Sequence, residues 1–230
     1  MIAGLNNKYM HDALRYASQI AYSSKEVLRF TYDVAVRYRN SPGCYVECGV
    51  AAGAQIIAMG AGAPDKTVYA YDSFEGIPLP SNRDDQMPGI CFLSETESKL
   101  LPDPGKQELK SSGATVVSLS DFVDNLCESR VLLKDLQVRK GWFEQTVKYH
   151  SEPISILRLD GDLYSSTFVC LQHLYPKCLP GAMIIIDDYG LKGCRAAVQE
   201  YFDSIGEGYL IDHFKFIEGK DSQVAYFTKP

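Results

Sequence analysis

Four aspartates at the ends of two apolar runs are the residues of this chain best placed to bind a metal ion. The first run begins at Ile154 and ends in Asp160 and Asp162. The second ends in Asp187 and Asp188. Both runs have the length and β-branched composition of buried strands, and the residues between them fit a helix, so we expect a parallel pair. Neighbouring strands lie about 4.8 Å apart, and carboxylates gathered at their ends would repel one another, so we expect a hard cation here.

A glycine-bearing turn earlier in the chain has the composition of a nucleoside-binding turn. An expected strand over residues 44–48 ends at Gly49, and a helix begins close after Gly53. Such a turn brings backbone N–H groups and a helix N-terminus to a ligand. Asp72 ends the next strand, 19 residues after Gly53, near the spacing at which an acid binds ribose hydroxyls, although an acid there is also a common turn cap. The pattern departs from Gly-x-Gly-x-x-Gly, which disfavours a nicotinamide cofactor.

The remaining patterns supply the elements that position these residues. Helices alternate with strands, which predicts an α/β fold with a Rossmann-like, doubly wound, mostly parallel sheet. The last two strands predict an antiparallel edge hairpin that turns near Gly219. The expected strands cover residues 44–48, 67–72, 136–140, 154–159, 182–186, 209–216 and 222–228, and the expected helices include two over 8–39 and others over 119–130, 165–173 and 193–202.

Turn and cap residues mark where several of these elements begin. Ser24 is expected to cap the second N-terminal helix, and Ser118 a later one with Asp121 in a capping-box position. Ser165 or Ser166 is the expected cap of the helix between the two acid-bearing strands. The pair Pro180-Gly181 is expected to turn the chain into the second of these strands.

Composition bounds the class of protein. The chain has 230 residues, a formal charge of −6 and a pI near 5.3, which fits one domain over 1–230 and disfavours nucleic-acid or anionic-membrane partners. No apolar run approaches membrane-spanning length, so we expect a cytoplasmic protein. The seven cysteines form no CxxC pair and are expected to be free thiols rather than disulfides or zinc ligands.

Two segments are expected to cover the sheet. Residues 1–42 predict a helical cover whose aromatic side chains either pack on the sheet, line a substrate pocket or form a homodimer contact. Residues 77–113 are irregular and proline-rich. A long irregular segment after a strand that bears a ligand-binding acid is expected to be a lid over the active site; the alternative is a mobile surface insertion.

A histidine base is not supported, because none of the four histidines falls at a strand end with the acids. The histidines are His11, His150, His173 and His213. A carboxylate therefore serves as base, or metal binding alone suffices; Asp187 is the first candidate and Asp162 the second. Asp162 is equally well interpreted as a helix-capping residue. The single tryptophan, Trp142, is expected either to fill core or to stack on a ligand.

Five sequence blocks together resemble a known enzyme family. They are Glu47-Cys-Gly-Val50, Asp72-Ser-Phe-Glu-Gly76, Lys140-Gly-Trp-Phe143, Leu157-Arg-Leu-Asp-Gly-Asp-Leu-Tyr164 and Ile186-Asp-Asp-Tyr-Gly190. In this order, across residues 44–205, they resemble the macrocin-type sugar O-methyltransferases of macrolide biosynthesis. The resemblance implies a class I methyltransferase fold, S-adenosylmethionine (SAM) as methyl donor, Mg²⁺ dependence and a sugar or glycoside hydroxyl as acceptor.

The resemblance also implies roles for individual residues. Asp160, Asp187 and Asp188 would bind Mg²⁺. The expected catalytic residues are Asp187 and Asp162, the base candidates named above, together with Asp160. By the resemblance, Glu47, Gly49, Asp72, Ser73, Lys140, Gly141 and Trp142 would line the SAM site. We expect Val50, Gly53, Ser118 and Asp160 to belong to the same site. This chain departs from the family at Ala51-Ala52, where a bulky and a basic residue are common, and the N-terminal helices and residues 77–113 do not match closely.

Three other functions fit parts of the same pattern. A catechol-type O-methyltransferase would use the same donor and metal with a phenolic acceptor. A metal-dependent hydrolase would use the acids to activate water and would not bind S-adenosylhomocysteine (SAH). A non-catalytic nucleotide-binding protein would bind the cofactor without turnover.

Overall fold

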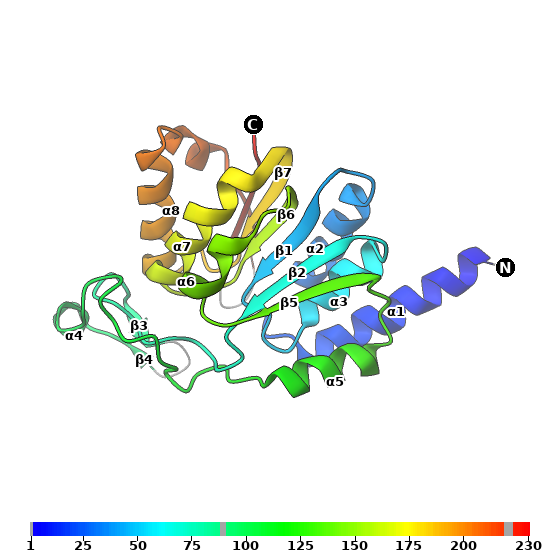
Figure 1. Cartoon of the computed structure of the whole chain (residues 1–230), viewed down its shortest axis with the longest axis horizontal. Helices are drawn as coiled ribbons and strands as arrows, with labels where there is room; N and C mark the ends of the chain where they lie inside the picture. Colours follow the sequence, from blue (N-terminus) through cyan, green and yellow to red (C-terminus); the bar gives the residue numbers. More distant parts are fainter. Residues whose placement is uncertain (1, 88–90, 219–222) are drawn as a thin grey trace.

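A central seven-stranded sheet organises the chain, which we describe from a computed structural model over residues 2–87, 91–218 and 223–230 (Figure 1). The strand order is β5-β2-β1-β6-β7-β9-β8. The strands are β1 (Cys44–Cys48), β2 (Thr67–Asp72), β5 (Asp135–Lys140), β6 (Ile154–Leu159), β7 (Cys178–Ile186), β8 (Lys215–Glu218) and β9 (Gln223–Thr228).

The sheet is mostly parallel, as predicted. Strands β5, β2, β1, β6 and β7 pair in parallel, whereas β9 is antiparallel to both β7 and β8. The predicted parallel pair β6–β7 and the antiparallel edge are therefore confirmed, while the expected turn at Gly219 lies outside the described residues. Strand order reverses between β1 and β6, and this reversal is where ligands bind in open α/β sheets.

Helices cover both faces of the sheet (Figure 1). Because both faces are covered, the central strands are apolar throughout, and all six residues of β6 are buried. One layer consists of α1 (Ile2–Ile20), α2 (Lys25–Tyr38), α3 (Ala54–Gly62) and α5 (Leu119–Ser129); the other consists of α6 (Phe143–Thr146), α7 (Tyr164–Leu174) and α8 (Lys192–Ser204), with 3₁₀ turns at Val147–Tyr149, Tyr175–Lys177 and Gly208–His213.

Two of the predicted helix caps are confirmed and one is wrong. The Ser24 side chain accepts a hydrogen bond from Val27 N, and Ser118 forms a capping box with Asp121. Helix α7, by contrast, begins before Ser165 and Ser166, and its N-cap residue Leu163 has no side-chain cap. Its first free amide, Tyr164 N, instead donates to Asp84 Oδ1 at 2.8 Å. A carboxylate 80 residues away replaces the local serine.

Two predicted boundaries near the edge of the sheet are also wrong. Strand β7 already begins at Cys178, and its register with β6 shifts between Ile154 and Ile156, so Pro180-Gly181 forms an irregularity within the strand rather than a turn before it. The expected strand over 209–216 is a 3₁₀ helix as far as His213. Leu210 and Phe214 are both buried, but Asp212, which a strand would place on the same face, is exposed, so the burial does not follow strand alternation.

The described residues of the segment 77–113, which are 77–87 and 91–113, form short elements that project beyond the carboxyl ends of the strands (Figure 1). The elements are β3 (Gln86–Met87), β4 (Cys91–Phe92) and α4 (Glu95–Lys99). Backbone hydrogen bonds tie the two ends of the segment together, from Ile77 N to Ala114 O at 3.0 Å and from Ser112 N to Ile77 O at 2.8 Å. We call residues 77–113 the projecting segment.

Two further findings concern the composition-based expectations. All seven cysteines are free, five of them buried and two, Cys91 and Cys127, exposed. Within the described parts of the chain, no helix combines the length and the apolar character needed to cross a membrane.

Gly49 is predicted to be irreplaceable at the point where β1 meets the loop after β6. Its φ is +87°, and a Cβ there would collide with the carbonyl oxygen of Asp160. Gly105 is a matched control, because its φ is +79° but a Cβ would meet nothing within 4 Å. We expect Gly49→Ala to lower the free energy of unfolding by about 1–3 kcal/mol more than Gly105→Ala, because overpacking adds to the shared backbone strain. Urea denaturation of both variants measures the difference, and equal losses would contradict the prediction.

Candidate active site

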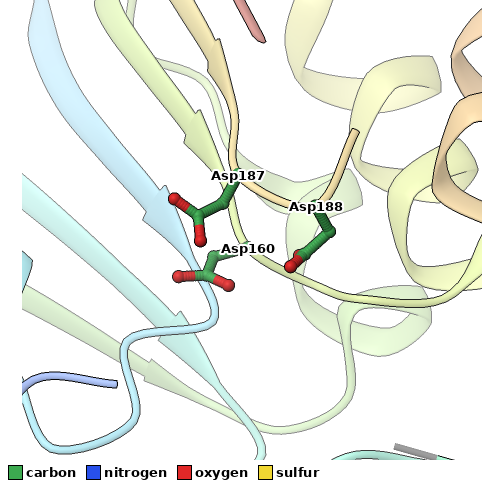
Figure 2. A group of neighbouring side chains, drawn as sticks. All are labelled: Asp160, Asp187 and Asp188. Carbon is green, nitrogen blue, oxygen red and sulfur yellow. The ribbon is translucent and has the colours of Figure 1, made fainter. Parts of the chain in front are cut away.

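The structure brings together the three carboxylates that the sequence places at two strand ends. Asp160 follows β6, and Asp187 and Asp188 follow β7 (Figure 2). One oxygen of each lies within 4.8 Å of the others. Asp187 and Asp188 are only 6% and 8% exposed, so water screens their mutual repulsion poorly.

One oxygen of each of these carboxylates accepts a hydrogen bond from the protein. Asp160 Oδ2 accepts a hydrogen bond from Arg158 Nη1 at 2.6 Å, and Asp187 Oδ1 accepts one from Arg158 Nη2. Asp188 Oδ2 accepts one from the Asp162 amide at 2.9 Å. Among the described residues, no protein donor binds the second oxygen of any of the three. Three hard oxygen atoms therefore remain, which is the donor set that Mg²⁺, Ca²⁺ or Mn²⁺ prefers.

Arg158 is a central residue that the sequence analysis missed. Its side chain is fully buried and also pairs with Glu47 Oε1 at 3.0 Å. The available signal was an arginine inside an otherwise apolar strand, because a buried charge requires partners of opposite charge.

Burial and crowding raise the pKa values of the acids. Burial raises the pKa of Glu47 to about 8, against the opposing effect of Arg158. Burial, reinforced by neighbouring aspartates, also raises the pKa values of Asp187 and Asp188. Burial and the charges of Asp160 and Asp187 raise the pKa of Asp162 to about 7. The cluster therefore holds protons near neutral pH unless a cation replaces them.

A cavity of about 320 Å³ opens beside the acids, at the carboxyl ends of the strands. Five of the expected SAM-site residues line it, together with the acids Asp162, Asp187 and Asp188. These five are Gly49, Asp72, Ser73, Trp142 and Asp160. The lining residues that the sequence analysis did not name as cofactor-binding, catalytic or metal-binding are Tyr22, Ser23, Ala51, Gly76, Ile77, Pro78, Gln86, Thr115, Phe143, Glu144, Gly161, Ser166 and Leu191.

The other expected SAM-site residues lie behind or away from the cavity wall. Glu47 is 1% exposed within β1, and its Oε2 has no hydrogen-bond partner among the described residues. Val50 is buried, and Gly53 packs against Phe122. Ser118 is exposed, and its hydroxyl is engaged in the capping box of α5. Lys140 is the exposed last residue of β5, and Gly141 N donates to Asp72 O at 2.9 Å.

The Asp72 carboxylate organises the glycine-bearing turn. Its Oδ2 accepts hydrogen bonds from Val50 N at 2.8 Å and Ala51 N at 2.9 Å, and its Oδ1 accepts one from Phe74 N at 2.7 Å. A carboxylate can accept about four hydrogen bonds, so these three leave one acceptor position. Asp72 thus caps the turn and still lines the cavity.

Asp84, in the projecting segment, also reaches the acid-bearing loops. It is 2% exposed and accepts hydrogen bonds from Ser81 N, Ser81 Oγ and Tyr164 N, each at 2.8 Å. A Cβ at Gly193 would collide with Asp84 Oδ1, so this glycine in α8 makes room for the carboxylate. The projecting segment is therefore fastened to α7 directly after the Asp160–Asp162 loop.

Comparisons with known proteins agree with this architecture. The solved O-methyltransferase NovP is 28% identical, with a TM-score of 0.66, and the match covers 90% of this chain and 80% of that one. The calicheamicin methyltransferase CalS11 has the same fold at 15% identity, with a TM-score of 0.62 over 96% of this chain and 91% of that one. The fold is that of class I SAM-dependent methyltransferases.

The family follows from the sequence comparisons. The macrocin O-methyltransferase (TylF) family model matches residues 29–207. Mycinamicin III 3''-O-methyltransferase of Micromonospora griseorubida is 38% identical over 173 residues, which is 72% of this chain and 62% of that protein. Demethyldecarbamoylnovobiocin O-methyltransferase of Streptomyces niveus is 32% identical over 183 residues, which is 75% of this chain and 64% of that protein. This chain belongs to the macrocin O-methyltransferase (TylF) family, and its matches span less than two thirds of these relatives' lengths.

The crowding of acids predicts an unusual dependence of stability on pH. Because the pKa values of Glu47, Asp162 and Asp187 are raised, the folded chain holds protons that the unfolded chain releases above about pH 5. In chelator, Tm should therefore fall as the pH rises from about 6.5 to about 8.5. The pKa of buried His150 is lowered, so this histidine stays neutral in both states over most of that range.

Added Mg²⁺ or Ca²⁺ should raise Tm more at the higher pH, because the cation no longer competes with protons. Differential scanning fluorimetry across this pH range, with and without cation, makes the measurement. A metal-free Tm that rises toward pH 8.5 would contradict the raised pKa values.

Proposed function

We propose that this protein transfers a methyl group from SAM to a hydroxyl of a sugar or glycosylated natural product, with Mg²⁺ bound at the acid cluster. The observation that carries the proposal is the juxtaposition of Asp160, Asp187 and Asp188 with a cavity at the strand-order reversal. The names of the family and of its relatives support a glycoside acceptor. Solved methyltransferases of the same fold were crystallised with SAH, which supports SAM as the donor.

We assign one half of the cavity to the methyl donor and the other half to the acceptor. Gly49, Asp72, Ser73 and Trp142 would hold the donor, with the remaining acceptor position of Asp72 toward the ribose hydroxyls. Glu47, Val50, Gly53, Ser118, Lys140 and Gly141 would act from behind this wall, by shaping the turns that carry it. The projecting segment would serve as the lid over the acceptor, since Ile77, Pro78 and Gln86 line the cavity.

In the reaction, the acceptor oxygen loses its proton to a carboxylate and takes the methyl group from the sulfonium sulfur, leaving SAH. We propose that Asp162 is the carboxylate that accepts this proton. Its side chain forms no hydrogen bond among the described residues, it lines the cavity, and its pKa of about 7 suits a base at neutral pH. Asp187, the first candidate from sequence, is already paired with Arg158.

The metal would be held by the free oxygens of Asp160, Asp187 and Asp188. When bound, Mg²⁺ supplies Lewis-acid stabilisation of the negative charge that develops on the acceptor oxygen. Arg158 and the Asp162 amide keep the ligand carboxylates in place.

Asp188→Asn is predicted to abolish the response to metal while leaving the loop intact, because the amide oxygen can still accept from Asp162 N. SAH should raise Tm of the wild type, and Mg²⁺ should raise it further, since a ligand that binds only the folded state must stabilise it. In Asp188→Asn the additional rise from Mg²⁺ should disappear. The surface variant Asp203→Asn, on α8, is the control and should behave as wild type.

Methyl transfer should be assayed on a panel of glycosides and catechols, with and without chelator. Activity that is indifferent to chelator would remove the metal role. Turnover of catechols alone would replace the sugar acceptor by a phenol, and SAH binding without turnover on any acceptor would favour a non-catalytic protein.

Asp162→Asn is predicted to lower kcat by about 10²–10⁴, the usual contribution of a general base. Asp162 has a φ of +57°, which asparagine tolerates, so the variant should fold. Wild-type kcat should rise with pH to a plateau, because the base must be unprotonated, and the variant should lose this dependence. Binding of SAH and Mg²⁺, followed by calorimetry, should stay within a few-fold of wild type. Unchanged kcat in Asp162→Asn would return the role to Asp187 or to the metal alone.

A further inference from the structure

Arg158 links three strands directly behind the acid cluster. Its guanidinium pairs with Glu47 on β1, with Asp160 after β6 and with Asp187 after β7. In the sheet register Arg158 lies opposite Glu47 on one side and Ile185 on the other. A guanidinium is planar and presents its donors in fixed directions, so these contacts determine where the carboxylates point.

We propose that Arg158 is a positioning residue for the divalent-cation site. It holds one oxygen of Asp160 and one of Asp187, and the second oxygen of each carboxylate is thereby left for the cation. Glu47 binds the same Nη1 at 3.0 Å that binds Asp160 at 2.6 Å, and so fixes the guanidinium from the β1 side. Figure 2 shows Asp160 and Asp187 meeting from the ends of adjacent strands. The inference rests on the metal role within the proposed function.

The orienting contacts of Arg158 and its positive charge are expected to have opposite effects on the affinity for a cation. The positive charge of Arg158 repels a cation, so charge alone predicts that removing it strengthens metal binding. Loss of orientation predicts weaker binding, and groups that orient metal ligands typically contribute about 10–100-fold in affinity. The sign of the change therefore distinguishes a positioning residue from one that only balances charge.

Two variants separate these effects. Arg158→Lys keeps the charge but removes the forked donor set. The double variant Glu47→Gln/Arg158→Met removes one acidic and one basic group, so above about pH 8, where Glu47 is ionised, the net charge of the cluster is unchanged while the orienting contacts are lost. Arg29→Lys is the matched control, because Arg29 forms an exposed pair with Asp33 on α2, away from the site.

Mn²⁺ and Mg²⁺ affinities should be measured without substrate, by calorimetry and by metal-dependent thermal unfolding, with circular dichroism to verify folding. We expect the cation Kd to rise about 10–100-fold in Arg158→Lys and in the double variant, and to stay unchanged in Arg29→Lys.

Each outcome decides the inference. A cation Kd that is within twofold of wild type, or lower than wild type, in either folded Arg158 variant would overturn it. Failure of both variants to fold would assign Arg158 a structural role instead. A wild-type protein that binds no divalent cation would remove the metal role itself, which is a different result from an unchanged Kd.

Discussion

The ion cluster around the fully buried Arg158 is the interaction on which the rest of the site depends. One guanidinium pairs with three carboxylates, and burial together with the nearby charge of Asp162 raises the pKa of Asp188. Transferring such charges out of water costs free energy, and ion pairing offsets this cost only when its geometry is good. The cluster has more negative than positive charge, so it remains incomplete without protons or a cation. Three adjacent strands are held in register behind it.

Carboxylates in and around the site also bind the backbone of neighbouring segments. Asp72 caps the turn after β1, Asp188 binds the Asp162 amide, and Asp84 caps α7. Of the three proposed metal ligands, Asp188 uses one oxygen for its backbone contact, and Asp160 and Asp187 use one each for Arg158, so the other oxygen of each stays available. The same residues therefore supply both the rigidity and the ligand atoms of the site. Asp162, which has no such structural bond among the described residues, is the one left free for chemistry.

The features that could be predicted from the sequence are those that depend on the pattern of neighbouring residues. Strands β6 and β7 were visible as apolar runs because helices cover both of their faces, and the acids at their ends implied convergence once the strands were taken as parallel. Contacts between distant residues were not visible. Asp84 caps α7 from a distant part of the chain, and Arg158 is paired with Glu47 on a neighbouring strand. The 3₁₀ helix after α8 was mistaken for a strand because its buried residues are too few to show a period.

The acidic lining of the cavity also suits the change in charge that accompanies methyl transfer. Six acids line it and, among the described lining residues, no lysine, arginine or histidine does: the acids are Asp72, Glu144, Asp160, Asp162, Asp187 and Asp188. Methyl transfer from a sulfonium converts a cationic donor into a neutral sulfide, and the same event converts an ionised base into its neutral acid. Both charges disappear together, so a poorly solvated site favours the reaction, since it disfavours the charged reactants more than the neutral products. The burial that raises the pKa of Asp162 thus serves proton transfer, and the acidic lining that attracts a cationic donor has less hold on its neutral product.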